Sequence, residues 1–285
     1  MNNAIEIKDL TKTYSNFELK NINLEIPRGI IVGLIGENGA GKTTLIKSIL
    51  NIIHKDTGSI KIFGKDYQQY ENEIKEDIGV VLDDEFFPEL LTAKDINYIM
   101  KDIYKNWDQL LFYKYLSDFK IDDKKIIKNF SKGMKKKLEI ATSLSHHPKL
   151  LILDEPTSGL DPVVREEVLD IFMNFLQDEE NTILLSTHIT SDLENIADKI
   201  IFIDKGNKIL DISRDELFDN YGILKCDLEK FKTINKEDII TYKKNKYDVR
   251  ILINNRKKLA KKYQDLLIDK ITLEELMVLM IKGGK

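Results

Sequence analysis

A glycine-rich stretch near the start of the chain has the pattern of a phosphate-binding loop. Residues 36–43 read GENGAGKT and fit G-x-x-x-x-G-K-[ST], with an apolar run before them and a helix-like segment after them. Glycines allow successive backbone N–H groups to point at phosphate oxygens where a helix begins, and the helix dipole adds partial positive charge there. We therefore expect a nucleotide to bind to Gly36, Glu37, Asn38, Gly39, Ala40, Gly41, Lys42, Thr43 and Thr44.

Two side chains of this loop have specific roles in such a site. Lys42 is expected to bind the β- and γ-phosphates as a point charge, and the hydroxyl of Thr43 is expected to ligate Mg²⁺. A glycine-rich turn without a ligand is the alternative explanation. The strand pattern before the loop and the helix pattern after it favour the nucleotide.

Two adjacent acids form a second candidate element. The segment KLLILDEP, residues 149–156, places Asp154 and Glu155 after four apolar residues of a predicted strand. The acids would lie at the carboxyl end of that strand, which is the edge where α/β sheets bind ligands. Asp154 is expected to hold the Mg²⁺ shell, and Glu155 is expected to act as general base on the water that attacks the γ-phosphate. The two elements together predict nucleotide hydrolysis.

The hydrophobic pattern predicts the elements that position these residues. Short or alternating apolar runs indicate strands at residues 5–10, 20–26, 29–36, 58–64, 78–83, 149–155, 181–188 and 198–204. The strands beside the two motifs are apolar throughout, as in a parallel sheet covered by helices, whereas the first strands look antiparallel. The predicted fold class is an α/β P-loop core with a mostly parallel sheet and antiparallel N-terminal strands.

Two further parts are predicted beside this core. Residues 84–148 have helical patterns without a convincing strand, which indicates a helical subdomain inserted in a nucleotide-binding domain of residues 1–222. Residues 223–285 are rich in lysine and are expected to form a small α+β domain. A segment of that size is near the lower limit for independent folding, so we expect it to pack on a neighbour.

Composition places the chain among ordinary globular proteins. Of its 285 residues, 42% are hydrophobic and 32% are charged, and the net charge of -4 gives no global reason to expect nucleic acid as a partner. The single cysteine, Cys226, excludes an internal disulfide. The N-terminus lacks a secretory pattern and no apolar run reaches membrane-spanning length. Work at a membrane would therefore need another protein to hold the chain there.

A run of lysines has two explanations. Residues 129–141 read NFSKGMKKKLEIA. The lysines could form a basic patch for nucleic acid or an anionic membrane, or they could begin a helix whose first residues touch a nucleotide. The acidic balance of the whole chain weakens the first explanation.

The motifs taken together resemble those of the ATP-binding cassette family over roughly residues 4–220. Residues 130–134, FSKGM, stand where the family has its signature, usually Leu-Ser-Gly-Gly-Gln, just before a helix and upstream of the acidic pair. The resemblance implies a head-to-tail dimer in which Ser131 and the N–H of Gly133 face the γ-phosphate of ATP held by the other subunit. The lysines follow the signature, and most of Lys135, Lys136 and Lys137 are expected on a solvated helix face.

The resemblance extends to single residues elsewhere in the chain. Asp161 lies in the family's loop between the two ATP sites and is expected to contact the opposite subunit, and His188 matches the switch histidine that hydrogen-bonds the γ-phosphate. Tyr14 matches the aromatic residue that stacks on adenine. Asp83 replaces a glutamine that ligates Mg²⁺ at the hinge of the helical subdomain. We expect Asp83 to keep that role with altered coupling to the subdomain.

The function that the resemblance implies is the ATPase subunit of a transporter, with ATP and Mg²⁺ as cofactors. Its partners would be a separate transmembrane permease and a second ATPase subunit in a homodimer or heterodimer, with no nucleic acid. It would be cytoplasmic, on the inner face of the cell membrane. Lys132 and Met134 in the signature resemble drug- and peptide-exporting cassettes, which favours export. Two alternatives stay open, namely a cassette ATPase outside transport and an ATP-gated regulator whose C-terminal part senses a ligand.

Overall fold

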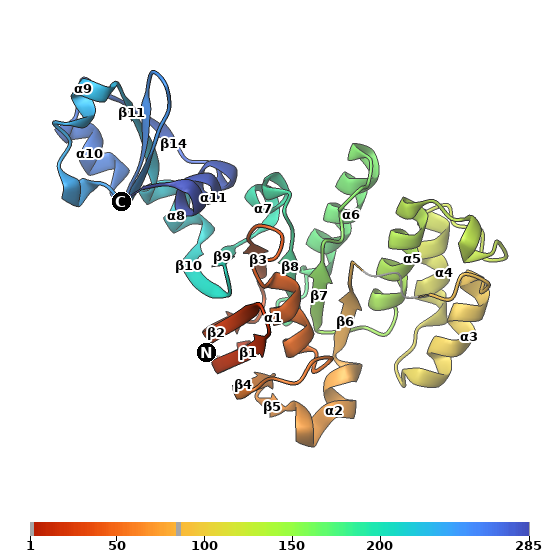
Figure 1. The fold of residues 1–285 in the computed structure, drawn as a ribbon. Helices are drawn as coiled ribbons and strands as arrows, with labels where there is room; N and C mark the ends of the chain where they lie inside the picture. The colour runs from red at the N-terminus through yellow and green to blue at the C-terminus, as the bar shows by residue number, and fades with distance from the viewer. Residues whose placement is uncertain (1–2, 84–86, 285) are drawn as a thin grey trace. The chain divides into compact units, whose positions relative to one another are not determined.

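The computed structural model describes residues 3–83 and 87–284, which fall into two compact units (Figure 1). The first unit comprises Met1–Ile189 and Ile201–Ile209, and the second comprises Thr190–Ile200 and Leu210–Lys285. Residues 84–86, where the helical subdomain is predicted to begin, lie outside the described residues.

An antiparallel sheet begins the first unit. Its strand order is β2-β1-β4-β5, and each neighbouring pair runs antiparallel. Ile5, Ile7 and Leu24 are almost completely buried, while the polar residues that alternate with them are more exposed, as the sequence pattern predicts. The strands are β1 (Asn3–Tyr14), β2 (Phe17–Pro27), β4 (Thr57–Ile62) and β5 (Lys65–Asp66).

A six-stranded sheet contains the strands next to both chemical motifs. Its order is β10-β9-β3-β8-β7-β6, and the pairs β3–β8, β8–β7 and β7–β6 are parallel. Every residue of β3, β7 and β8 is buried, which accounts for their uninterrupted apolar runs. The strands are β3 (Ile31–Ile35), β6 (Ile78–Val81), β7 (Leu150–Asp154), β8 (Thr182–Ser186), β9 (Lys199–Asp204) and β10 (Asn207–Ser213). The predicted α/β class is confirmed.

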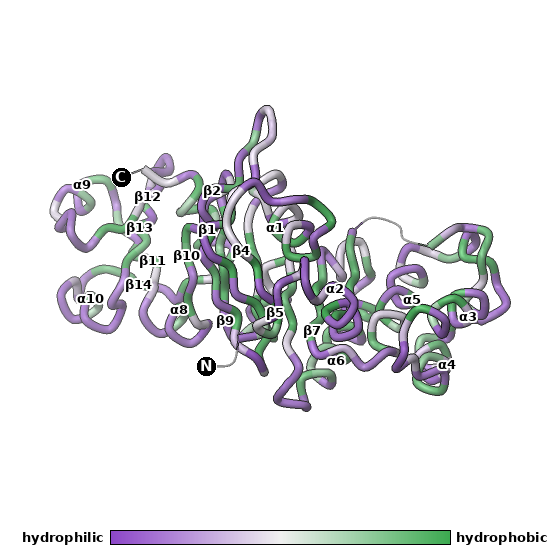
Figure 2. The backbone as a smooth tube through the Cα atoms, turned by 90° about the horizontal axis from the view of Figure 1, so that it is seen from below, coloured by the Kyte–Doolittle hydropathy of each residue, from purple (hydrophilic) through white to green (hydrophobic). Residues whose placement is uncertain are grey.

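Helices pack beside these strands in the first unit. In Figure 2, hydrophobic segments gather among the strands, while hydrophilic segments form most of the outer loops. Three of the helices are α1 (Lys42–Ile49), α2 (Tyr67–Glu76) and α6 (Pro162–Phe175). Asp161 caps α6 and Pro162 occupies its first turn, so the local sequence fixes where that helix begins.

Helices occupy the segment between β6 and β7, where the sequence predicts a helical subdomain. This segment contains α3 (Ala93–Ile103), α4 (Gln109–Asp118), the short 3-10 helix η1 (Ile127–Asn129) and α5 (Lys132–Leu144). Thr92 and Asp95 form a capping box at α3, and Asp108 and Ser131 cap α4 and α5. The three α-helices pack on one another, as Figure 1 shows, and α5 also packs on β6. Within residues 87–148, the only strand-like pairing is an isolated bridge between Thr92 and Ile126.

The second unit is built on an antiparallel sheet of order β12-β13-β11-β14. Its strands are β11 (Gly222–Cys226), β12 (Thr241–Lys244), β13 (Val249–Ile253) and β14 (Leu267–Lys270). Its helices are α7 (Thr190–Ile196), α8 (Arg214–Asn220), α9 (Leu228–Phe231), η2 (Lys236–Asp238), α10 (Arg256–Lys262) and α11 (Leu273–Lys282). Leu224, Ile251 and Leu259 belong to its hydrophobic core.

Helix α7 belongs to this second unit because it packs along α11. The backbone N–H of Leu273 donates to Glu194 Oε1 at 2.6 Å, which fastens the start of α11 to α7. A domain boundary at residue 222 therefore stays a prediction. Among residues 3–83 and 87–284, no helix combines the length and the apolar character needed to cross a membrane.

Candidate nucleotide-binding site

The glycine-rich loop joins β3 to α1 at the carboxyl end of β3. Gly36 packs so closely on Ile203 that a Cβ atom would lie 2.4 Å from the carbonyl oxygen of Ile203, while Gly39 and Gly41 have φ angles of +81° and +114°. Glycine adopts these conformations without steric cost. Gly41 offers no side chain to cap α1, which leaves the first turn of the helix to an anion.

Lys42 folds back over this loop. Its Nζ donates to the carbonyl oxygens of Gly36 at 2.7 Å and Glu37 at 3.4 Å, and the residue is 6% exposed. Burial lowers the pKa of Lys42, while the carboxylates of Glu155 and Asp154 counteract the shift. An ammonium held by two carbonyl oxygens at the loop can exchange them for phosphate oxygens.

Asp154 is held from two sides at the end of β7. Thr43 Oγ1 donates to Asp154 Oδ2 at 2.8 Å, and the buried hydroxyl of Ser186 donates to Asp154 Oδ1. The residue is 1% exposed, so these hydroxyls supply the hydrogen bonds that water would otherwise give the carboxylate. Sequence reasoning missed Ser186. The available signal was a polar residue at the carboxyl end of a mostly apolar strand.

The donor set around Thr43 suits a hard divalent cation. Thr43, Asp154 and Asp83 offer oxygen atoms at or beside one cleft, and Mg²⁺ takes oxygen ligands, commonly one or two from protein and the rest from phosphate and water. Within residues 3–83 and 87–284, no group of three His, Cys, Asp or Glu side chains forms a metal site of its own.

Replacing Ser186 with alanine should raise the Mg²⁺ concentration needed for half-maximal nucleotide hydrolysis about tenfold. The buried Asp154 would keep the Thr43 bond and lose the second one, so its carboxylate would be less well oriented. A Mg²⁺ titration of nucleotide hydrolysis measures this as a raised midpoint concentration. Ser143→Ala is the control, because that buried hydroxyl bonds only a helix carbonyl, Ile140 O. An unchanged midpoint in Ser186→Ala would show that Asp154 is positioned without Ser186.

Glu155 sits at a sharp turn that follows β7. Its φ of +51° is unusual for a residue other than glycine and costs about 1–3 kcal/mol, and its N–H donates to the carbonyl oxygen of Ser186 at 2.9 Å. Its Oε2 lies 2.7 Å from His188 Nδ1 and accepts the His188 backbone N–H at 3.3 Å. The turn directs the carboxylate to the cleft, and His188 fixes its orientation. This pair has the geometry to orient and deprotonate a water.

A cleft of about 480 Å³ brings most of the predicted residues together. The volume is typical of a small-molecule site. Asp154 adjoins the cleft through Thr43, and His188 adjoins it through Glu155. The lining residues are Asn16, Phe17, Glu37, Asn38, Gly39, Gly41, Lys42, Thr43, Thr44, Asp83 and Glu155.

The aromatic wall of the cleft is formed by Phe17. A Cβ atom at Gly41 would lie 2.8 Å from Phe17 Cζ, so the ring packs directly on the loop. Tyr14, which is predicted to stack on adenine, is 44% exposed and lies beside Phe17 with the ring centroids 6.5 Å apart. Sequence reasoning missed Phe17 and Asn16. The signal was the hairpin itself, because Tyr14 pairs with Phe17 where β1 ends and β2 begins.

The signature residues and Asp161 lie outside this cleft. Ser131 Oγ and Asp161 Oδ1 accept backbone N–H groups at 3.2 and 3.1 Å and cap α5 and α6. A Cβ atom at Gly133 would lie 3.6 Å from Leu160 Cδ2, so the signature adjoins the loop that follows the acidic pair. Within one chain Ser131 and Asp161 act as helix caps, Gly133 lies in the first turn of α5, and none of the three lines the chain's own nucleotide cleft.

Two of the lysines after the signature are not on a solvated face. Lys136 is 5% exposed and its Nζ donates to Leu82 O at 2.8 Å. Lys137 has an 11% exposed side chain and pairs with Glu167 at 2.6 Å. The expectation of a solvated face is wrong for both residues. Helix α5 packs on β6 on one side and faces α6 through Lys137 on another, and a run of charges does not reveal that packing.

The fold and the site together define a P-loop nucleoside triphosphatase. The phosphate loop follows β3 and the acidic pair follows β7, and one strand, β8, lies between them and supplies Ser186. The chain belongs to the ABC transporter family, whose model matches residues 19–158. It is an ATP-binding and ATP-hydrolysing subunit of such a transporter, as its sequence motifs predict.

Known proteins resemble the chain over most of the ATPase part. The bacitracin transport ATP-binding protein BcrA of Bacillus licheniformis is 37% identical over 76% of this chain and 72% of its own length. The lantibiotic transport ATP-binding protein SrtF of Streptococcus pyogenes is 37% identical over 76% of this chain and 96% of its own length. Among solved structures, an ATP-binding subunit of an ABC transporter has a TM-score of 0.69 at 27% identity, covering 75% of this chain and 91% of that one.

Proposed function

We propose that two such chains, or this chain and a related one, close over two ATP molecules and drive a separate transmembrane permease. One observation carries the proposal: the nucleotide cleft contains the phosphate loop, Lys42 and Glu155, but not Ser131, Gly133 or Asp161. These three residues cap or begin helices elsewhere in the chain. A second subunit that presents its own signature would complete each cleft.

The proposed reaction uses the side chains that line or adjoin the cleft. The loop N–H groups and Lys42 bind the phosphates, and Glu155, oriented by His188, takes a proton from the attacking water. Mg²⁺ bound by Thr43, Asp154 and the phosphates would neutralise charge that develops on the oxygens. Loss of the γ-phosphate removes the contact with the opposite signature, so hydrolysis reopens the dimer.

Asp83 would be a further Mg²⁺ ligand. It follows β6, its side chain lines the same cleft as Thr43 and Glu155, and it is exposed. An aspartate carboxylate is shorter than a glutamine side chain and carries a full charge, so the ion would hold the end of β6 tightly. This links metal binding to the strand that enters the helical insertion.

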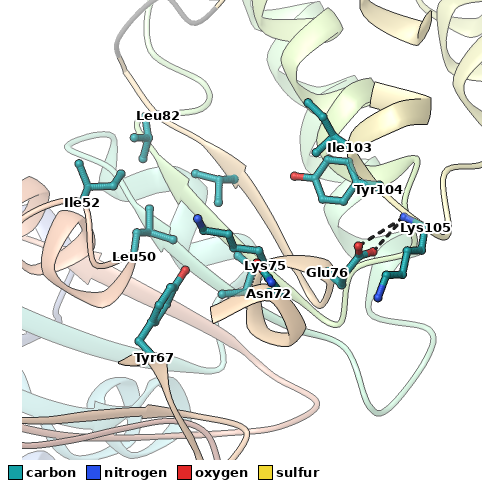
Figure 3. Close-up of a pocket in the computed structure, with 12 residues that line it drawn as sticks. Leu50, Ile52, Tyr67, Asn72, Lys75, Glu76, Leu82, Ile103, Tyr104 and Lys105 are labelled. Carbon is teal, nitrogen blue, oxygen red and sulfur yellow. Dashed lines mark hydrogen bonds between the residues drawn. The ribbon is translucent and has the colours of Figure 1, made fainter. Parts of the chain in front are cut away.

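A groove in the first unit is a suitable docking site for the permease. It has a volume of about 510 Å³ and lies between the ends of α1 and α3, with α2 along it (Figure 3). Lys105 donates its backbone N–H to both carboxylate oxygens of Glu76 at 3.3 Å, which joins α2 to the segment after α3. The lining residues of this α2–α3 groove are Leu50, Ile52, Tyr67, Asn72, Lys75, Glu76, Ile78, Val80, Leu82, Ile103, Tyr104 and Lys105.

The groove fits an amphipathic helical segment of a membrane subunit. Ile52 and Ile103 are 56% and 57% exposed at its margin, and charges of both signs, Lys75 and Glu76, border the apolar floor. Residues of β6 form part of that floor, and β6 leads directly to Asp83. An occupant of the groove would therefore contact the strand that ends at the proposed metal ligand.

The names of the relatives support a direction of transport and a substrate class for the permease. They are named for transport of bacitracin and of a lantibiotic, which favours export of a peptide antibiotic or a similar compound. The site would then face the cytoplasm, with the chain held at the inner side of the membrane by its permease. Co-purification of a polytopic membrane protein with this chain tests the proposed partnership with a permease.

Replacing Ile103 with aspartate should reduce permease capture at least tenfold. The change puts a charge into an apolar contact, while a side chain that is 57% exposed contributes little to folding. Tagged chains are purified from native membranes in mild detergent, and mass spectrometry measures co-purified polytopic membrane proteins. Met173→Asp, at a 47% exposed residue of α6 outside the groove, is the control. Capture of ribosomal proteins, or of no membrane protein, by the unaltered chain would contradict the proposed partnership with a separate permease.

A further inference from the structure

A buried ion pair lies on α5, the helix that begins at the signature and is called the signature helix below. Lys136 Nζ is 2.7 Å from Glu139 Oε2 and 2.8 Å from the carbonyl oxygen of Leu82. The side chains of Lys136 and Glu139 are only 6% and 7% exposed. The pair therefore sits in the packed contact between α5 and β6, where a lysine and a glutamate are rarely found.

Burying a charged pair in this contact is energetically unfavourable compared with burying apolar side chains. Taking an ammonium and a carboxylate out of water costs free energy that their attraction recovers only in part, and apolar side chains of similar volume often serve stability as well. What apolar side chains cannot do is hold a particular carbonyl oxygen in place. The Lys136 ammonium does this for Leu82, and the carboxylate of Glu139 lies within ion-pair distance of the ammonium and balances its charge.

The carbonyl that Lys136 holds belongs to the residue directly before Asp83. Asp83 lines the nucleotide cleft, and β6 ends just before Leu82. At its other end, α5 begins at the signature, with Ser131 as its cap. One side chain thus joins the segment that carries the proposed metal ligand to the helix that carries the signature. The neighbouring Lys137 has a different partner, Glu167 on α6.

We propose that the Lys136–Glu139 pair positions Asp83 for Mg²⁺–ATP and transmits its displacement to the signature helix. This rests on the proposed function, since Asp83 is there a metal ligand and Ser131 a contact to the opposite nucleotide. When Asp83 moves toward the ion, the Leu82 carbonyl moves with it and pulls on Lys136. Helix α5 follows, and Ser131 moves with the helix.

The test uses full-length chains in which Glu155 is replaced with glutamine, so that hydrolysis does not interfere. The affinity for a fluorescent N-methylanthraniloyl ATP is measured by titration, once with Mg²⁺ in the buffer and once with EDTA instead of Mg²⁺. With Lys136→Met, the increase in ATP affinity that Mg²⁺ causes should be about tenfold smaller. The ATP affinity measured in EDTA should stay unchanged. Light scattering should show a matching rise in the ATP concentration needed for dimerisation.

Four further variants separate positioning from folding. Lys137→Met removes another well-covered lysine of the same helix and should keep the response to Mg²⁺. Lys136→Leu combined with Glu139→Leu replaces the pair with apolar side chains, so it should keep the unfolding temperature while the Mg²⁺ response is still lost. Asp83→Ala should lose the response as well, and adding Lys136→Met to it should cost nothing more.

The outcomes distinguish the inference from the function on which it rests. Loss of the Mg²⁺ response in Asp83→Ala but not in a well-folded Lys136→Met, or losses that add in the double variant, would overturn the positioning role. Failure of the Glu155→Gln chain itself to dimerise with ATP would instead contradict the proposed function. If Lys137→Met lost the Mg²⁺ response as much as Lys136→Met does, the Lys136–Glu139 pair would be an ordinary packing contact. That result would also overturn the inference.

Discussion

Glu155→Gln abolishes most steady-state ATP hydrolysis, by about two to four orders of magnitude, and leaves ATP binding intact. An amide has almost the shape of a carboxylate but cannot accept the proton of the attacking water. The side chain keeps a hydrogen-bonding position opposite His188, whose Nδ1 lies 2.7 Å from Glu155 Oε2, so the cleft should retain its form. Phosphate release measured against ATP concentration gives the loss, and equilibrium binding of labelled ATP gives the retained affinity.

A surface acid provides the control for this change. Glu73, whose side chain is 60% exposed and pairs with Lys65, should tolerate Glu73→Gln with hydrolysis within about twofold of the unaltered chain. Turnover of Glu155→Gln that equals that of Glu73→Gln would remove Glu155 from the role of base. The general base would then have to be sought elsewhere around the cleft.

Lys42→Met weakens ATP binding about tenfold to 100-fold and reduces hydrolysis at least as much. The thioether fills the space of the lysine stem but removes a charge-assisted contact with the phosphates, which is worth about 1.5–3 kcal/mol. Lys42 lies over the loop and is held by the Gly36 and Glu37 carbonyl oxygens, so it is already positioned for the ligand. Because a buried cation disappears, the unfolding temperature should not fall sharply.

Titration calorimetry with ATP in excess Mg²⁺ measures this prediction. Lys61→Met, at an exposed position on β4, serves as the control and should bind ATP as the unaltered chain does. Equal ATP affinity in Lys42→Met and Lys61→Met would mean that the loop N–H groups alone bind the phosphates. The assignment of Lys42 as the principal phosphate cation would then fail.

The phosphate loop was predictable because its signal is contiguous. Eight adjacent residues fix the turn, the helix start and the cation, and the strand before them is apolar throughout. The membership of β3, β7 and β8 in a parallel sheet was predictable for the same reason, since doubly buried strands have uninterrupted apolar sequences. Local sequence was sufficient where local interactions decide the geometry.

Residues that join the site from distant segments were not predictable in this way. Ser186 reaches Asp154 only because β8 pairs with β7, and Phe17 reaches the loop only because a hairpin returns it there. Lys136 looked like part of a solvated run, and its burial follows from the packing of α5 on β6. Tertiary packing decides such positions, and the composition of the segment does not show it.

The short elements of the second unit illustrate the same limit. Strand β14 has only four residues, including the exposed Leu267, and its sequence alone does not separate it from a loop. Helix α7 joins that unit through the bond between Leu273 and Glu194, a contact between residues 79 positions apart. A division by composition near residue 222 cannot detect such a contact.

The central claim is that ATP binding joins two chains across a shared nucleotide. The most direct test is the mass of the Glu155→Gln chain, measured by light scattering with and without Mg²⁺–ATP, together with its content of bound nucleotide. We expect the monomer mass of 33.1 kDa without ATP. With ATP we expect about twice that mass and one ATP per chain, and Ser131→Arg should abolish the dimer while ATP still binds. A chain that binds ATP and stays monomeric, or a dimer that Ser131→Arg leaves intact, would contradict the claim.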